Sequence, residues 1–207
     1  SQTNEIQVSP SDINLNEIVL ENIYLVRESA IKKQITVNSS DFGEYRIFAD
    51  ANMMRTVLRN LLINAIKFTS RGGVVSISAQ KLDGFVKISV ADTGIGIPEK
   101  DVNTILTTGI GISQNGTEGE KGSGLGLVLC KEFVVRNGGV FMVESEPGKG
   151  SAFYVCLPRL TDGEDECGDR CQLAPRGIER VLFVDDENLL AQMAGEMLSN
   201  LGYAVTS

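Results

Sequence analysis

Apolar and polar residues follow clear periods along several stretches of this 207-residue chain. Residues 14–33 carry apolar side chains at helical spacing, without proline or glycine, and predict an amphipathic helix. Residues 52–68 predict a second helix, which Asp50 can cap at its N-terminus. A third helix is expected at residues 125–136, where the sequence Asn-Gly-Gly that follows is typical of a helix end.

Six short apolar or alternating runs predict strands, at residues 35–37, 45–49, 74–80, 85–91, 140–145 and 151–157. We expect the first two strands to form a hairpin, because they flank the turn-rich sequence NSSDFGE. Residues 98–123 show little periodicity and contain many glycine, threonine and serine residues. A connection of that length inside a compact domain is usually functional or mobile.

Composition shifts indicate how the chain is divided. Residues 1–12 are polar and predict a linker, residues 13–160 a full domain, and residues 161–178 an acidic linker. Residues 179–207 contain a short apolar run, two adjacent aspartates and an amphipathic helix, which predicts a strand-helix-strand piece. A piece this short cannot bury a core, so we expect a truncated second domain and a longer parent chain.

Composition also excludes several classes of function. The chain has 19 Lys and Arg against 27 Asp and Glu, a net charge of -8, which argues against a nucleic-acid-binding surface. No apolar run approaches the roughly 18 residues of a membrane span, and the cysteine spacing favours reduced thiols in the cytoplasm. Since the sequence has no histidine, a histidine base, metal ligand or phosphoacceptor is excluded.

The first candidate site lies on the second predicted helix. Asn60, Asn64 and Lys67 are spaced so that they share one face, opposite the apolar residues of that helix. A carboxamide oxygen suits Mg²⁺, and a lysine can neutralise phosphate charge. The alternative is a polar stripe that simply faces solvent.

The second candidate site is the end of the strand at residues 85–91. Asp92 has the same parity as the inward-facing apolar residues before it, so its carboxylate should point inward and needs a donor such as a purine amine. Gly94 and Gly96 would let the backbone approach a flat ligand, and Ile97 offers an apolar surface. The alternative is an ordinary strand-to-loop turn that the aspartate caps.

The third candidate site is a glycine-rich segment before the third predicted helix. Gly122, Gly124 and Gly126 would leave backbone N–H groups free at a helix start, an arrangement that binds phosphate. The segment follows an irregular loop rather than a strand and lacks the Gly-Lys-Ser/Thr end, which excludes the dinucleotide-binding and P-loop motifs. The sequence TGIGI occurs at residues 93–97, after Asp92, and again at residues 108–112, but no inward-facing acid precedes the second copy.

In this order, the three sites resemble the ATP-binding domain of sensor histidine kinases, which belongs to the superfamily of gyrase, heat-shock chaperone and mismatch-repair ATPases. Residues 60–69 resemble its N box, residues 92–97 its G1 box and residues 122–127 its G2 box, and residues 145–158 are similar to its closing hairpin. The resemblance implies a Bergerat-type α/β fold: a two-layer sandwich of a mixed, mostly antiparallel sheet with helices on one face.

The resemblance also implies a role for each matching residue. Asn64 would ligate Mg²⁺. Asn60, Lys67 and Lys121 would lie at the phosphates as catalytic residues, and Lys121 would belong to a lid at residues 98–121. The remaining ATP-binding residues would be Phe68, Asp92, Gly94, Gly96, Ile97, Gly122, Gly124, Leu125, Gly126, Leu127 and Ser151. Of these, Asp92 would accept from the adenine amine, and Ser151, inward by strand parity, would be a second partner beside it.

The γ-phosphoryl acceptor of such kinases is a histidine on dimerisation helices, which we expect before Ser1 because this chain has none. The chain should therefore bind ATP and Mg²⁺ without phosphorylating itself. Residues 181–187 resemble the start of a response-regulator receiver domain, in which Asp185 and Asp186 would bind Mg²⁺. The parent would then be a homodimeric hybrid kinase of a phosphorelay, cytoplasmic in this part, with its own helices and receiver as partners and no nucleic acid.

Two other functions remain open at this point. A nucleotide-binding adaptor is favoured by the absence of an aromatic residue in the lid sequence at residues 105–114, where the family usually carries a phenylalanine. An ATP hydrolase is disfavoured, because Asn60 stands where those enzymes place a glutamate, and an amide is a poor base.

Overall fold

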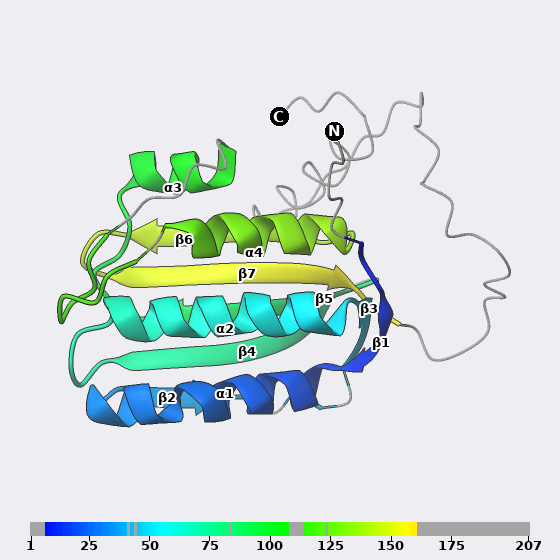
Figure 1. Ribbon diagram of the computed structural model, residues 1–207, viewed down its shortest axis with the longest axis horizontal. Coiled ribbons are helices and arrows are strands. Elements are labelled where there is room, and N and C mark those ends of the chain that lie inside the picture. The colour runs from blue at the N-terminus through cyan, green and yellow to red at the C-terminus, as the bar shows by residue number, and fades with distance from the viewer. Residues whose placement is uncertain are drawn as a thin grey trace, which may run out of the picture. The chain divides into compact units, whose positions relative to one another are not determined.

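The computed structural model describes residues 7–40, 42–43, 45–82, 84–107, 114–122 and 124–160. Within these ranges a five-stranded sheet is covered on one face by helices (Figure 1). The predicted linker at 161–178, the receiver piece at 179–207 and the TGIGI copy at 108–112 lie outside the described residues.

The helices of the described region are α1 (Leu15–Lys32), α2 (Ala51–Phe68), α3 (Glu99–Thr107) and α4 (Leu125–Arg136). Three of these four helices, α1, α2 and α4, agree closely with the helical periods of the sequence. The strands are β1 (Ser11–Asn14), β2 (Thr36–Ser39), β3 (Arg46–Ala49), β4 (Val74–Leu82), β5 (Phe85–Asp92), β6 (Val140–Glu146) and β7 (Gly150–Pro158). The predicted cap of α2 is confirmed, since the Asp50 carboxylate accepts from the amides of Asn52 at 2.9 Å and Met53 at 3.0 Å.

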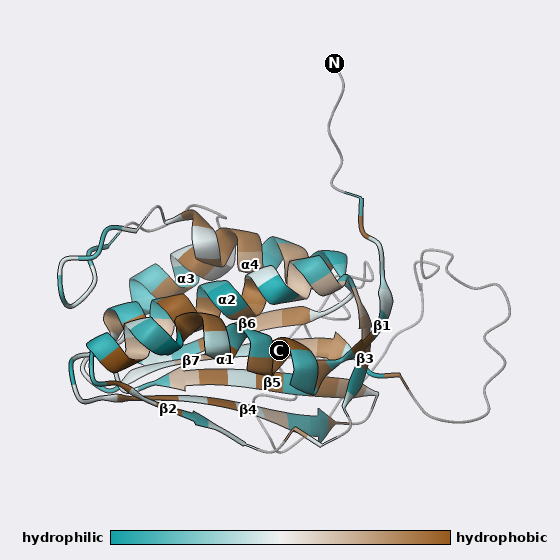
Figure 2. Cartoon of the chain, turned by 60° about the horizontal axis from the view of Figure 1, so that its bottom comes forward, coloured by the Kyte–Doolittle hydropathy of each residue, from teal (hydrophilic) through white to brown (hydrophobic). Residues whose placement is uncertain are grey.

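The sheet order is β2-β4-β5-β7-β6, in which β2 and β4 are parallel and the other pairs are antiparallel. The predicted mixed, mostly antiparallel sheet with helices on one face is thereby confirmed. Figure 2 shows the helices of the described region above the sheet. None of these helices is long and apolar enough to cross a bilayer.

The predicted hairpin of the first two strands is wrong. β2 joins the main sheet beside β4, whereas β3 pairs with β1 in a separate two-stranded sheet. Phe42, inside the predicted turn, is buried in the core at 1% exposure. Hydrophobic burial thus outweighs the local turn signal.

Two segments expected to be irregular contain regular structure. Ser11–Asn14, partly inside the predicted linker at 1–12, forms β1 and buries Ile13 in the core. Glu99–Thr107, inside the aperiodic stretch, forms α3. Pro98 accepts from the amides of Asp101 and Val102, at 2.8 Å and 3.1 Å, at the start of that helix.

The core lies between α2 and the sheet. The apolar face of α2 is 0–1% exposed, at Val57, Leu58, Leu61, Leu62 and Ala65. On β5 the residues of inward parity are equally buried, at Val86, Ile88 and Val90. Burial of each such side chain contributes about 1.5–3 kcal/mol, so this interface holds the polar face of α2 in a fixed position over the sheet.

Candidate functional site

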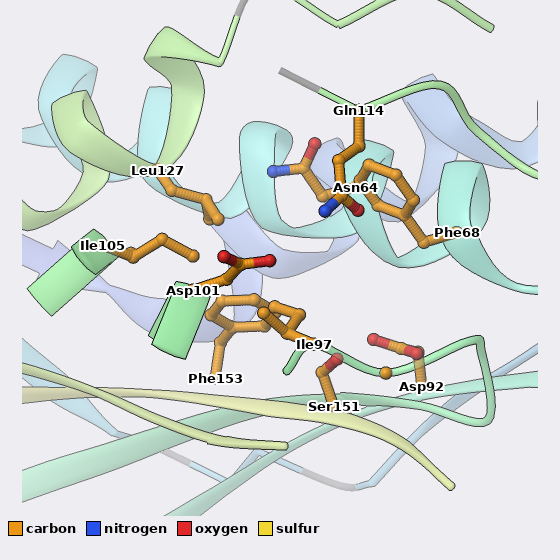
Figure 3. Close-up of a pocket in the computed structure, with 11 residues that line it drawn as sticks. Asn64, Phe68, Asp92, Ile97, Asp101, Ile105, Gln114, Leu127, Ser151 and Phe153 are labelled. Atoms are coloured by element: carbon orange, nitrogen blue, oxygen red, sulfur yellow. The ribbon is translucent and has the colours of Figure 1, made fainter. Parts of the chain in front are cut away.

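Two adjoining cavities lie between the polar face of α2, the end of β5 and the start of α4, and Figure 3 shows the residues that line the first of them, the sheet-side cavity. The sheet-side cavity is lined by Asn64, Phe68, Asp92, Gly96, Ile97, Asp101, Ile105, Gln114, Leu127, Ser151 and Phe153. The loop-side cavity is lined by Asn60, Ile63, Asn64, Lys67, Phe68, Ile105, Gln114, Lys121, Gly122, Gly124, Gly126, Leu127 and Val128. Shared residues such as Asn64 and Leu127 make the two cavities one continuous site.

Asp92 provides the buried acid of the sheet-side cavity. It ends β5 with the inward parity that the sequence indicates, and it is 9% exposed. Its Oδ1 accepts from the Gly94 amide at 2.8 Å. Burial raises the pKa of this carboxyl, although hydrogen bonds from the backbone of Gly94 and Ser151 oppose the shift.

Ser151 lies directly opposite Asp92 in the antiparallel β5–β7 ladder, and both side chains line the cavity (Figure 3). Its hydroxyl is 2.9 Å from that of Ser145, which accepts from the Ile97 amide at 2.7 Å and donates to the Gly150 carbonyl at 2.9 Å. Because Ser145 has one hydroxyl proton, Ser151 donates to it and keeps its lone pairs for an incoming donor.

At Gly94 and Gly96 the backbone of this loop passes close to the backbone of other segments of the protein. A Cβ on Gly94 would lie 2.4 Å from the Phe68 carbonyl oxygen, and one on Gly96 would lie 2.0 Å from that of Glu146. Gly96 and Ile97 line the sheet-side cavity, whereas Gly94 lies behind Asp92 as a donor. The glycines therefore hold the loop in place around the acid.

Asn60, Asn64 and Lys67 all face the loop-side cavity, so they do not form a stripe exposed to solvent. Lys67 is 9% exposed, and its Nζ donates to the Gln114 carbonyl at 2.8 Å. The same ammonium lies 4.6 Å from the centre of the Phe68 ring. The cavity thus contains a buried cation beside an aromatic face.

The glycine-rich segment forms the wall opposite Lys67. A Cβ on Gly122 would lie 2.4 Å from Lys67 Nζ, so only glycine fits there without displacing the ammonium. Gly124 and Gly126 also line this wall, at the N-terminus of α4, whose backbone N–H groups favour an anion. Leu127 lines both cavities, but the Leu125 side chain is 65% exposed and lines neither.

Several lining residues were not singled out from the sequence. Asp101 and Ile105 come from α3, which a proline followed by acidic residues could have indicated. Phe153 shares the parity of Ser151, while Gln114 carries no local signal. Ser145 was also missed, because its role depends on contacts with Ile97 from another segment and with Gly150 and Ser151 across the hairpin.

The donor set suits a cation held jointly with a ligand. Within the described residues, no group of three or more histidine, cysteine or acidic side chains could hold a metal ion alone. Asn64, whose side chain carries a carboxamide oxygen, lines both cavities. Asp185 and Asp186 lie outside the described residues.

Sequence comparison finds relatives among bacterial signalling proteins. Residues 49–161 match the family described as histidine kinase-, DNA gyrase B-, and HSP90-like ATPase. The adaptive-response sensory kinase SasA of Prochlorococcus marinus is 35% identical over 152 residues, covering 72% of this chain and 41% of that protein. The sensor histidine kinase ZraS of Klebsiella oxytoca is 34% identical over 158 residues, covering 75% of this chain and 33% of that protein. The chain thus spans between one third and about two fifths of the length of these relatives.

Solved structures share the fold. The catalytic domain of histidine kinase ThkA has a TM-score of 0.63 at 29% identity, covering 73% of this chain and 96% of that domain. Full-length ShkA, solved in complex with AMPPNP, has a TM-score of 0.63 at 25% identity, covering 95% of this chain and 40% of ShkA.

Proposed function

The chain belongs to the family of histidine kinase-, DNA gyrase B- and HSP90-like ATPases, a fold that binds ATP, and from this premise we propose that it is the ATP-binding catalytic domain of a sensor histidine kinase. The observation that carries the proposal is the polarity of the continuous site. A buried carboxylate and a hydroxyl lie at one end, and a buried ammonium and a glycine-rich helix start lie at the other.

The sheet-side cavity suits a purine. Asp92 and Ser151 offer acceptors to an exocyclic amine, and burial strengthens such a bond by excluding water. Ile97, Phe68 and Leu127 supply the apolar surface that a flat base needs. ATP would therefore place adenine against the sheet.

The loop-side cavity suits the phosphates. Lys67 and Lys121 supply positive charge, and the backbone of the glycine-rich segment supplies donors near Asn60. Asn64 would hold Mg²⁺ together with phosphate oxygens, and bound Mg²⁺ would neutralise phosphate charge. Asn60, Lys67 and Lys121 are our candidates for the catalytic residues.

The loop-side lining favours transfer to an external acceptor over hydrolysis. Among the described residues, no aspartate or glutamate lines that cavity, so a base for an attacking water is lacking there. The sequence contains no histidine, so the acceptor imidazole must come from outside this chain. The domain would position ATP and neutralise its charge while the acceptor attacks the γ-phosphorus and ADP leaves.

Calorimetric titration with ATP and ADP tests the binding step. Asp92→Asn keeps an oxygen for the Gly94 amide but turns an NH₂ group toward the purine amine, so we expect at least about a tenfold loss of affinity. Asp12→Asn, an exposed aspartate paired with Arg46 on β3, is the matched control and should bind normally. If the unmodified chain binds no nucleotide in Mg²⁺, an adaptor that has lost ATP would replace this proposal.

Phosphoryl transfer needs the histidine-bearing dimerisation helices, which we place before Ser1. A chain extended with those helices should acquire acid-labile, base-stable phosphate from radiolabelled ATP, whereas the 207-residue chain should not. Release of inorganic phosphate without any phosphoprotein would favour the hydrolase instead.

The finer parts of the proposal concern the parent protein. We assign residues 179–207 to the start of a receiver domain, in which Asp185 and Asp186 bind Mg²⁺, so the parent is a homodimeric hybrid kinase of a phosphorelay. Full-length ShkA matches 95% of this chain, a share that extends past residue 161, and this match supports the assignment. ThkA has been solved in complex with a response regulator, TrrA. The buried thiol of Cys130 fits a cytoplasmic location.

A further inference from the structure

Lys33 is a buried cation outside both cavities. It caps the C-terminus of α1 and is 3% exposed. Its Nζ donates to the carbonyls of Ile66 at 2.9 Å and Lys67 at 2.7 Å, and to Glu120 Oε1 at 2.8 Å. One ammonium thus joins the ends of α1 and α2 to a segment almost ninety residues away.

Glu120 uses both carboxylate oxygens in this arrangement. Oε1 accepts from Lys33, and Oε2 accepts from the Glu118 amide at 2.8 Å. The Glu120 carbonyl accepts from the Gly116 amide at 2.8 Å, which closes a compact turn. Burial opposes the charged carboxylate, but the bonds from Lys33 and from backbone amides outweigh it and hold the pKa at about 2.

The same turn is fastened to the end of α2 by Thr117. Its amide donates to the Lys67 carbonyl at 3.1 Å, and its hydroxyl donates to the Thr69 carbonyl at 3.0 Å. The next residues along the chain, Lys121 and Gly122, line the loop-side cavity. The position of that wall therefore depends on how the turn is held.

We infer that Lys33 and Glu120 are positioning residues for the nucleotide phosphates, because their ion pair sets where Lys121 and Gly122 stand. The inference rests on the proposed function, since it presumes that the loop-side cavity takes phosphates. It leaves the adenine end unaffected, because Asp92 and Ser151 belong to the sheet.

A matched pair of variants in the same turn tests this inference. Glu120→Ala and Glu118→Ala each remove one carboxylate and one ion pair, but the Glu118 partner is Arg71 in an exposed pair at 2.9 Å. We would measure the affinities of ADP, ATP and adenosine by calorimetry and chemical-shift titration with the full chain.

We expect Glu120→Ala to lower the affinities for ADP and ATP at least tenfold and to change the affinity for adenosine less than twofold. Glu118→Ala should change each of the three affinities less than twofold. Glu120→Gln, which keeps an acceptor for Lys33, should recover most of the loss. Lys33→Met should reproduce the Glu120→Ala pattern if it folds, and the Glu120 variants suffice if it does not.

The outcomes separate the inference from the proposed function. Equal nucleotide affinities for Glu120→Ala and Glu118→Ala would overturn the inference while the proposed function stands. A parallel loss for adenosine would also overturn it, because it would indicate general destabilisation. An unmodified chain that binds neither ADP nor ATP would overturn both.

Discussion

At the residue scale, the buried polar side chains divide into those that hold structure and those that face the cavities. Lys33 and Asp50 have their bonding capacity engaged by backbone groups and neighbouring side chains. Asp92 and Ser151 each make a bond to the protein and still line a cavity. Because their oxygens can accept more than one hydrogen bond, the second group can also bind a ligand.

Alanine substitutions at two glycines with positive φ should distinguish the cost of backbone strain from the cost of a steric clash. At Gly148, with φ +81 and open space around it, an alanine should cost about 1 kcal/mol of unfolding free energy. At Gly96, with φ +69, the added Cβ also meets the Glu146 carbonyl, so we expect a cost of about 3 kcal/mol or more. Urea denaturation of both variants checks this, and equal costs would contradict it.

The stability of the folded protein in acid should depend on the Glu120 carboxylate. Its pKa falls from 4.5 to about 2 on folding, because the bonds from Lys33 and backbone amides outweigh burial. A lowered pKa adds stability that is fully present above pH 4.5 and is lost as the pH falls toward 2. Glu120→Gln should therefore flatten the melting-temperature profile in this range, while Glu118→Gln, with the same change of charge, should leave it steep.

At the element scale, α2 serves two roles with two faces. Its apolar face packs against the sheet, and its polar face supplies Asn60, Asn64 and Lys67 to the loop-side cavity. Because the helix cannot rotate without exposing its apolar residues, core packing also sets the direction of the polar side chains.

Two substitutions on α2 test this division. Leu61→Ala, at a fully buried position, should cost about 2–5 kcal/mol of unfolding free energy through lost contacts and a cavity. Ile63→Ala, where the side chain is 46% exposed, should change it by about 0.5 kcal/mol. Chemical denaturation measures both, and similar costs would mean that Leu61 is not a core contact.

Local signals predict elements well, and non-local pairing poorly. The periods of α1, α2 and α4, the Asp50 cap and the inward parity of Asp92 all follow from neighbours in the sequence. The parallel pairing of β2 with β4 does not follow from neighbours in the sequence, because β3 and α2 lie between the two strands along the chain. Lys33 escapes prediction for the same reason, since its partners Ile66, Lys67 and Glu120 all lie in other segments.

At the scale of the whole molecule, residues 1–161 form a compact unit by themselves. A chain that ends after Thr161 should therefore unfold in one cooperative transition and bind ADP within twofold of the full chain. Calorimetric melting and titration check this prediction. A non-cooperative melt or a large loss of affinity would show that residues 162–207 are needed for folding or binding.

The pairing of Asp92 with Ser151 in the β5–β7 ladder limits how this molecule can evolve. Neighbouring residues of a strand point to opposite faces, so a one-residue slip of β7 against β5 would turn Ser151 and Phe153 away from the sheet-side cavity. Length changes within β7 should thus be selected against, because one change would displace both side chains. Insertions in related sequences should therefore lie outside β5 and β7.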